Sequence, residues 1–418
     1  MIPRSPTLNR FLGLVSVAAF VALSFARAGE GDMPLAIHAE TLHTAAGAPI
    51  RDGLVLVGRD GKLAYVGTAK DMAYTADHRV VHAKVVTPGL IDARATAGLS
   101  GLLNQPHDQD MLERSGAIQP ELRAIDAYNA QDPLVAWLRG FGVTTLNTGH
   151  GPGTLVPGQT MIVKTAGRSV ELDVVNPAAM TAVSLGNSGV VRETAKSPGT
   201  RAKAIAMLRA ELIKAQEYAK KREAKDETKR PGRDLKMETL LRALDGSQPL
   251  LVTAHRQMDI LAALRLAQEF NLKIVLDGCA DAPAVLAEIK ASGFPVVLHP
   301  TMARAAEDTV NLAMDTAKKL HDAGIPFAIQ SGYESYVPKT RVVLFEAALA
   351  AGKGLGFDAA LRAVTIEAAK VLGIAERTGS LEAGKDGDLA LYDGDPFEYT
   401  THCTGTVIDG RLYAGDAP

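Results

Sequence analysis

The chain has 418 residues, enough to bury a large core as one domain or as one domain with a smaller companion. A composition of 47% hydrophobic and 22% charged residues is typical of a soluble globular protein, and the formal net charge of −2 gives no indication of nucleic-acid binding. The two cysteines, Cys279 and Cys403, match no disulfide framework or metal-binding spacing, so we expect both to be free.

The beginning of the chain has the pattern of a secretory signal peptide. Arg4 and Arg10 precede an apolar run over 11–25, and small residues follow this run up to Ala28. The run is shorter than the roughly 20 residues that a membrane-spanning helix needs. We therefore expect 1–28 to be a signal peptide, the mature protein to be exported to the periplasm or the outside, and no stable membrane span to remain. An uncleaved anchor is the alternative.

The residues after this segment, and those near the C-terminus, have the pattern of short strands joined by tight turns. The stretch 53–67 contains two apolar runs around an Arg-Asp-Gly turn, which is typical of a β-hairpin. Two later stretches, 387–396 and 405–415, show similar runs, and Asp409-Gly410 is a second turn. Both ends are therefore expected to be β structure.

The central part of the chain alternates between apolar runs and helical stretches. The runs lie at 143–149, 249–255, 273–278, 294–300 and 325–332. Apolar residues at helical spacing mark 202–226, 259–270 and 358–373. This alternation predicts an α/β fold of the TIM (β/α)8 barrel type. A doubly wound open sheet is the alternative, although no Gly-rich dinucleotide loop follows an early strand.

Two motifs at the borders of this central part resemble those of a known family. "TPGLIDA" at 87–93 leads into the first barrel strand, and "RTGSLEAGKDGDLALYDGDP" at 377–396 leaves the barrel. Together they resemble the amidohydrolase superfamily, and in particular its exported imidazolonepropionase-like members. The resemblance covers about 35–415 of the chain.

The resemblance implies a domain organisation and an activity. It implies a TIM barrel over 87–375 and a small composite β-sandwich built from both chain ends, 33–86 and 376–418. It also implies metal-dependent hydrolysis of amide or related C–N bonds, with a divalent metal such as zinc as the family's cofactor.

The positions that would hold this metal carry other residues in this chain. The family's ligands are two histidines after "PGLID", a lysine on a middle strand, two further histidines and a late aspartate. The corresponding positions here are Arg94, Thr96, Thr181, Thr253, Gly278 and Gly332. Arginine has no lone pair to donate, threonine is a poor neutral ligand, and glycine has no side chain. We expect a degenerate metal centre without a cofactor, although a shift of register by two residues at Thr253 would make His255 a surviving ligand.

The substituted positions predict a pocket that binds a small molecule, and Arg94 would suit an anionic one. Arg94 could replace the positive charge of the metal and hold a carboxylate or phosphate, or it could pair with Asp92 or Asp277. The expected ligand-binding residues are Arg94, Thr96, Thr181, Thr253, His255, Cys279, Ser331 and Tyr333. His255 and Asp277 are the candidates for catalysis.

Three functions remain open on the sequence. The first is a protein that binds a small ligand or a partner without metal-dependent hydrolysis. The second is an active hydrolase of amide or cyclic amide bonds that uses a residual or rearranged site. The third is a structural subunit of a hetero-oligomer; a homo-oligomer is also compatible with the sequence. Nucleic acid is not expected as a partner.

Overall fold

The computed structural model describes residues 33–102, 105, 107, 109–190, 198–332 and 341–414. The predicted signal peptide and the predicted site residue Tyr333 lie outside these residues. Among the described residues, no helix combines the length and the apolar character that crossing a membrane requires.

The structure contains strands and helices in the order that the sequence pattern indicates. The strands are β1 (Leu35–Leu42), β2 (Ile50–Val57), β3 (Leu63–Thr68), β4 (Arg79–Pro88), β5 (Leu90–Ala95), β6 (Val143–Gly149), β7 (Gly158–Lys164), β8 (Val174–Ser184), β9 (Leu250–Ala254), β10 (Ile274–Gly278), β11 (Val296–Leu298), β12 (Phe327–Ile329), β13 (Leu389–Tyr392), β14 (Cys403–Ile408) and β15 (Arg411–Ala414). The helices are α1 (Pro133–Arg139), α2 (Val170–Asp173), α3 (Arg201–Arg222), α4 (Leu235–Leu244), α5 (Gln257–Phe270), α6 (Leu286–Ser292), α7 (Thr316–Ala323), α8 (Val343–Ala350), α9 (Phe357–Ala363) and α10 (Ile366–Val371).

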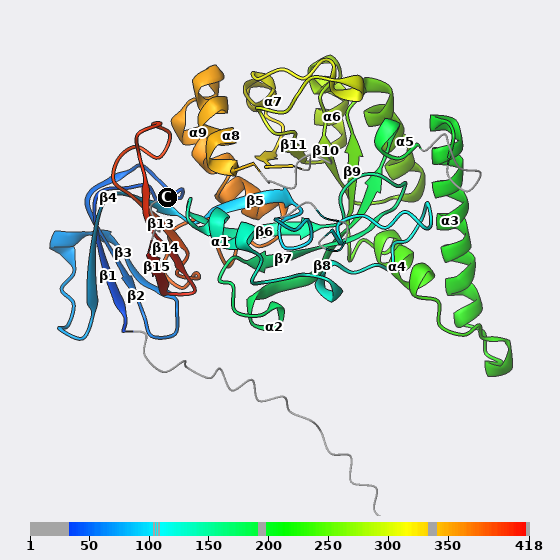
Figure 1. Ribbon diagram of the computed structural model, residues 1–418. Helices are drawn as coiled ribbons and strands as arrows, with labels where there is room; N and C mark the ends of the chain where they lie inside the picture. Colours follow the sequence, from blue (N-terminus) through cyan, green and yellow to red (C-terminus); the bar gives the residue numbers. More distant parts are fainter. Residues whose placement is uncertain are drawn as a thin grey trace, which may run out of the picture. The chain divides into compact units, whose positions relative to one another are not determined.

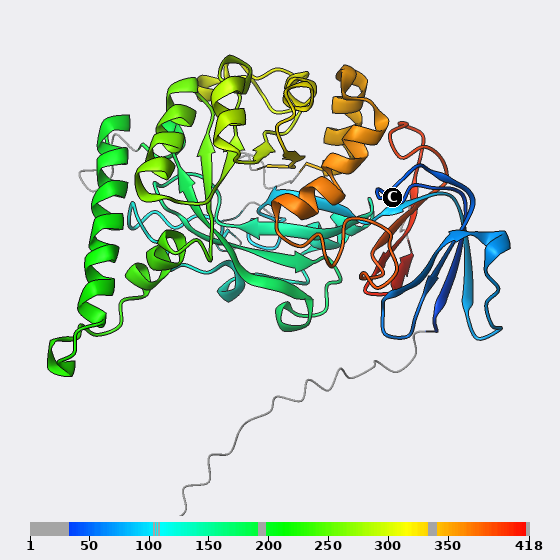
Figure 2. The same cartoon turned by 180° about the vertical axis from the view of Figure 1, so that it is seen from behind.

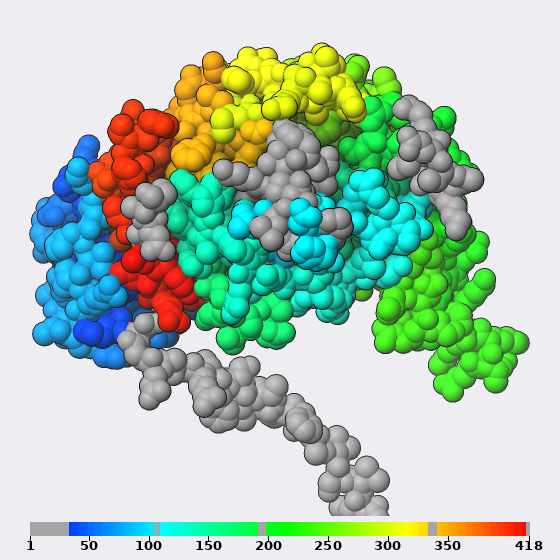
Figure 3. Space-filling view, viewed as in Figure 1, coloured from blue at the N-terminus to red at the C-terminus, as the bar shows by residue number. Residues whose placement is uncertain are grey.

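A seven-stranded sheet combines both ends of the described chain, in the order β15-β14-β13-β4-β1-β2-β3. β13 joins the N-terminal strands by pairing antiparallel with β4, where Leu389 lies opposite Pro88. Leu35, Ile37 and Val407 belong to one apolar cluster that both halves of the sheet build. In Figures 1 and 3 the red C-terminal strands lie beside the blue N-terminal ones. The composite domain expected from the resemblance is confirmed.

The turns of this sheet have the backbone conformation that tight hairpins need. β14 and β15 are joined by Asp409 and Gly410, with φ values of 49° and 79°. Positive φ at both central residues matches the right-handed twist of the paired strands, and glycine and aspartate tolerate it better than most residues. The predicted turns of both hairpins are therefore confirmed.

The second sheet has eight strands, in the order β12-β11-β10-β9-β8-β7-β6-β5, and nearly closes into a barrel. Its two edge strands approach each other where the Gly332 amide donates to the Arg94 carbonyl over 3.1 Å. Helices α8 and α10 pack against both β5 and β12 and cover this seam. Figure 2 shows the helices of the barrel from behind. The predicted α/β barrel is confirmed, and the open-sheet alternative is wrong.

One barrel strand departs from a regular (β/α)8 repeat. β7 runs antiparallel to both β6 and β8, so these three strands form a meander. A parallel crossover needs about a dozen or more connecting residues. The connections over 150–157 and 165–173 are shorter, and they therefore return the chain in the opposite direction.

Alternation along the barrel strands separates an inner from an outer layer. Leu251, Val275, Val297 and Ala328 lie in the inner cluster together with Ile91. Their neighbours one residue further along pack in the outer cluster beneath the helices. Since side chains alternate with a period of two, residues two positions after the inner cluster also face inward, nearer the carboxyl ends of the strands. These ends carry the polar side chains described below.

The helix expected over 358–373 is broken. α9 ends at Ala363 and α10 begins at Ile366, and Thr365 between them has non-helical dihedrals. The break frees the carbonyl of Val364, which accepts a hydrogen bond from the amide of Ile91 over 2.8 Å. The interruption therefore satisfies the backbone of β5 at the barrel seam.

The "GKDGD" part of the family motif fastens the composite sheet to the barrel. Lys164 of β7 is 2% exposed and forms ion pairs with Asp388, with Asp386 at 3.1 Å and with Asp409 at 3.4 Å. Burial lowers the pKa of Lys164, but the three carboxylates outweigh burial and leave it raised. Because β7 is antiparallel, Lys164 lies opposite Thr145 near the amino end of β6, so the motif has a structural role away from the carboxyl ends of the parallel strands.

Candidate functional site

Asp277 is the centre of a polar group at the carboxyl ends of the barrel strands. One of its oxygens accepts from the Thr253 hydroxyl over 2.5 Å, and the other accepts from the Gln330 amide nitrogen over 2.6 Å. The Gln330 nitrogen also donates to the Val297 carbonyl over 3.1 Å. Asp277 is 4% exposed. Two side chains hold its carboxylate in place, one from β9 and one that directly follows β12.

Arg94 brings a buried positive charge to this group. The ladder between β5 and β6 is irregular between Asp92 and Ala95, which turns this part of the strand. The guanidinium is 3% exposed, one of its nitrogens donates to the His150 carbonyl, and Nη1 has no partner among the described residues. Burial lowers the pKa of Arg94, while Asp277 and Asp92 oppose this effect. Within the described residues Arg94 makes no ion pair. The direct pair with Asp92 or Asp277, which was the alternative, is therefore not observed.

Three neutral histidines lie at the same strand ends. Burial, and then the charge of Arg94, lowers the pKa of His150 to about 4. Burial also lowers the pKa of His299 to about 4, with a smaller contribution from His255. Burial also lowers the pKa of His255, although the charge of Asp277 acts to raise it. All three rings are therefore uncharged at neutral pH, and each has at least one buried nitrogen without a partner among the described residues.

Two buried carboxyl groups lie next to the seam of the barrel. Burial raises the pKa of Asp92 to about 6, although it accepts hydrogen bonds from the amides of Ser331 and Arg94. Burial raises the pKa of Glu346 on α8 to about 7, and the charge of Asp92 adds to this rise. The Glu346 carboxyl accepts from the Met302 amide over 2.8 Å. Both groups therefore titrate near physiological pH.

The strand ends hold more unpartnered polar atoms than a folded core normally tolerates. Buried polar groups usually have a protein or water partner, because an unmet hydrogen bond costs about 1–3 kcal/mol. Here the atoms without a partner among the described residues are Nη1 of Arg94, Oδ2 of Asp92, Oδ1 of Asn147, both ring nitrogens of His150, Nδ1 of His255 and Nε2 of His299. Such a set is chemically suited to a polar ligand that supplies both donors and acceptors.

The structure brings together some of the predicted site residues. Arg94, Thr253, His255 and Asp277 belong to the group described above, and Ser331 touches it through Asp92. Thr96 is 4% exposed in the turn that follows β5, where its carbonyl accepts from two amides.

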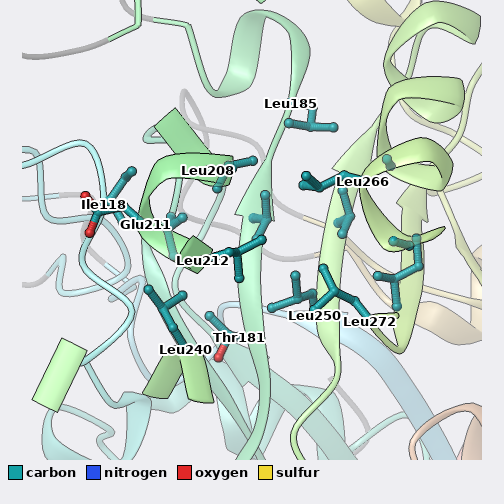
Figure 4. A pocket seen from close by; sticks show the side chains of 16 residues that line it. Ile118, Thr181, Leu185, Leu208, Glu211, Leu212, Leu240, Leu250, Leu266 and Leu272 are labelled. Carbon is teal, nitrogen blue, oxygen red and sulfur yellow. The ribbon is translucent and has the colours of Figure 1, made fainter. Parts of the chain in front are cut away.

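Thr181 is placed away from this group, whereas Cys279 is buried beside it. Cys279 is fully buried in the outer cluster beneath the helices, and burial raises the pKa of its thiol well above its usual value. Thr181 faces an apolar cavity of about 20 Å³ between the barrel and α3, α4 and α5. Figure 4 shows it with Leu212, Leu240 and Leu250 around this cavity. Thr181 therefore points outward from β8 and does not share the mouth with Arg94, whereas Cys279 directly follows β10, with its sulfur 4.0 Å from the Asp277 carbonyl oxygen.

Among the described residues, these strand ends present no donor set of the kind that a divalent metal needs. In the part of the chain that the structure describes, no three His, Cys, Asp or Glu side chains are arranged to hold a metal ion. Gly278 has a φ of +86°, and a Cβ atom there would lie 2.4 Å from the His255 ring. Gly332 has a φ of +78°, and a Cβ atom there would lie 2.6 Å from Pro300. Two of the substituted positions therefore have a backbone that disfavours any side chain.

Several residues of the group were not singled out as site residues by the sequence. Gln330 and Asn147 are ordinary polar residues within apolar runs, and their roles depend on which strand lies next to them. His150 and His299 each follow a buried strand directly, which is the signal that could have marked them. The strand-end position is therefore a better guide here than the residue type.

Comparison with known proteins supports the fold and the family. The model of the "Amidohydrolase family" matches residues 338–414. An imidazolonepropionase of Rhizobium rhizogenes is 25% identical over 91% of this chain and 96% of its own length. Amidohydrolase tasK of Hapsidospora irregularis is 26% identical over 79% of this chain, which spans 36% of that longer protein.

A solved structure gives the same result. The crystal structure of an amidohydrolase from Thermotoga maritima MSB8 has a TM-score of 0.85 and 28% sequence identity, covering 91% of this chain and all of that one. An eight-stranded barrel with a composite sheet from both ends, and polar side chains where the barrel strands end, defines a class of barrel proteins whose sites lie at that face. The chain belongs to the amidohydrolase superfamily.

Proposed function

We propose that this protein binds a small polar ligand at the carboxyl ends of the barrel strands, around Arg94, without metal-dependent hydrolysis. The observation that carries the proposal is a set of buried polar atoms that have no partner within the described ranges and lie where the superfamily fold carries its chemistry. The absence of a suitable donor set among the described residues, and the positive φ of Gly278 and Gly332 that disfavours a side chain at either position, support a degenerate metal centre. Export through the N-terminal segment is part of the same proposal.

The charges of the group favour a ligand that has an anionic end and a neutral polar end. Each oxygen of Asp277 already accepts one hydrogen bond, from Thr253 or from Gln330, which leaves it less of its acceptor capacity for a ligand. Nη1 of Arg94 has no partner among the described residues, and charge-assisted hydrogen bonds to a carboxylate are among the stronger ones in proteins. The neutral rings of His150 and His299 can each donate or accept, which suits an amide or a hydroxyl group.

Binding of N-acetylglycine, a small carboxylate with an amide, tests this proposal by calorimetry on the purified protein. The Arg94→Ala variant should bind at least about tenfold more weakly, because it loses one charge-assisted hydrogen bond. Arg123→Ala, a change at an exposed arginine, is the matched control and should leave binding unchanged. Equal affinity of Arg94→Ala and wild type, or stoichiometric zinc, manganese or iron held by the barrel, would contradict the proposal.

A second function, metal-free hydrolysis of amide bonds, is favoured by one observation. His255 lies in the field of Asp277, which raises its pKa against the effect of burial, as in an acid/base pair. If this function is present, the protein should release acetate from N-acetylglycine in the presence of a chelator, and His255→Ala should abolish the release. Nuclear magnetic resonance of the product measures this directly, and no release by the wild type excludes it for this amide.

A further inference from the structure

A separate cleft lies between the barrel and the composite sheet, away from the strand ends. It has a volume of about 400 Å³ and is bordered by α1, α8, β14 and β15. Figures 1 and 3 show teal α1 and orange α8 adjoining the red C-terminal strands. One lining residue, Phe141, precedes the amino end of β6, whereas the candidate functional site lies at the carboxyl ends. The cleft is therefore distinct from that site.

Five aromatic residues border this cleft. They are Trp137, Phe141, Phe345, Tyr399 and Tyr413, and Trp137 is the single tryptophan of the chain. Trp137 and Phe141 pack edge to face at 5.2 Å, and Phe141 and Phe345 do so at 5.3 Å. This packing fixes the rings before any ligand arrives, which lowers the entropy cost of binding.

The cleft also has a fixed positive charge, and the described residues that line it include no carboxylate. Arg139 lies 4.5 Å from the centre of the Tyr413 ring, and its Nη1 donates to the carbonyls of Thr165 and Ala166. In the described part of the chain, Arg139 makes no ion pair with a carboxylate, and none of the residues that line the cleft is acidic. The other basic group, His402, is paired with Asp393 at 3.3 Å.

We infer that this cleft is a second binding site, for a small planar aromatic anion such as an aromatic carboxylate or sulfonate. Its volume is within the range of roughly 300–1,000 Å³ that is usual for small-molecule pockets. A stable protein interface would need about 800 Å² on each partner. Among the described residues, the large apolar side chains exposed at this rim are Phe345 and Tyr399. The apolar surface of two side chains is too small for such an interface.

The single tryptophan allows a direct test with anilinonaphthalene sulfonate, whose absorption overlaps tryptophan emission. The bound probe should quench Trp137 and gain sensitised emission, with one probe per chain. Phe345→Ala should weaken binding about tenfold, and Tyr399→Ala, at a position 99% exposed where folding is not at risk, about threefold. Leu235→Ala removes an exposed leucine of α4 and should have no effect.

The role of the charge is tested with N-phenylnaphthylamine, the neutral analogue of the probe. The sulfonate should bind more tightly, and only its affinity should fall with added salt. Arg94→Ala should leave energy transfer unchanged, because Arg94 belongs to the other site. The inference is wrong if energy transfer is absent or if the Phe345→Ala and Leu235→Ala variants bind equally. It is also wrong if both probes bind with the same affinity at all salt concentrations. A dimer that buries the cleft, excludes the probe and is dissociated by Phe345→Ala would contradict it as well.

Discussion

Individual residues at the barrel mouth are fixed by backbone geometry as much as by their chemistry. The His255 ring lies directly over Gly278, and a methyl group added there would collide with it unless the backbone moved. A residue with a side chain at Gly278 would also have to adopt a φ that most residues avoid, at a cost of about 1–2 kcal/mol. Reintroducing a histidine at this position would therefore not rebuild a metal site by itself.

Glu346 and the two histidines His150 and His299 make opposite contributions to the pH dependence of the free energy of unfolding. The pKa of Glu346 rises from 4.5 to about 7, so the native state holds a proton that the unfolded chain releases. Its stabilising effect is present at low pH and is lost as the pH rises to about 7. The pKa of His150 and His299 falls from 6.5 to about 4, so their effect is present above pH 6.5 and is lost as the pH falls to about 4.

Glu346→Gln should therefore make the free energy of unfolding rise more steeply with pH between 4.5 and 7. The variant removes the group that opposes the histidines, and the difference over this range should be on the order of 3 kcal/mol. Glutamine keeps an oxygen that can accept from the Met302 amide, so the fold should remain. Urea unfolding at a series of pH values measures the slope, with the exposed Glu398→Gln as control. Parallel curves for Glu346→Gln and wild type would contradict this assignment.

At the scale of elements, the sequence predicted where the strands lie better than which way their side chains face. The run at 143–149 is β6 as observed, because a buried strand between turn residues is a strong local pattern. Thr181 was misplaced because it faces outward from β8, and moving the expected register by one residue turns a side chain to the other face. Gln330 meets Asp277 only because β11 alone separates β12 from β10 in the sheet, and no local pattern contains that contact.

Helix α3 depends on its N-cap. The Thr200 hydroxyl accepts a hydrogen bond from the Lys203 amide over 3.2 Å, which satisfies one of the free amides in the first turn. Thr200→Ala should lower the free energy of unfolding by about 1 kcal/mol, whereas Thr200→Ser should keep most of it. Denaturant unfolding of the two variants measures the difference. If Thr200→Ser lowers the free energy of unfolding as much as Thr200→Ala does, the hydroxyl is not acting as a cap.

At the scale of the whole molecule, the ion cluster of Lys164 holds the composite sheet to the barrel. Lys164→Met would leave Asp386 and Asp388 buried without their cation, and this should cost about 3–5 kcal/mol. Adding Asp388→Asn should recover part of the loss, because it removes one of the uncompensated charges. Thermal unfolding compares these variants with Lys214→Met, a change at a lysine whose side chain is 61% exposed. An effect of Lys164→Met no larger than that of the control would show that the cluster does not stabilise the junction.

The order in which the composite sheet is completed has a consequence for synthesis of the chain. β4 is made early, but its partner β13 begins at Leu389, so one edge of β4 stays without hydrogen bonds while the whole barrel is translated. An open strand edge can pair with other chains, and contacts between such distant residues form late. A ribosome stalled before residue 389 should therefore carry a chain that chaperones bind and proteases cut readily, even when its barrel strands have already emerged.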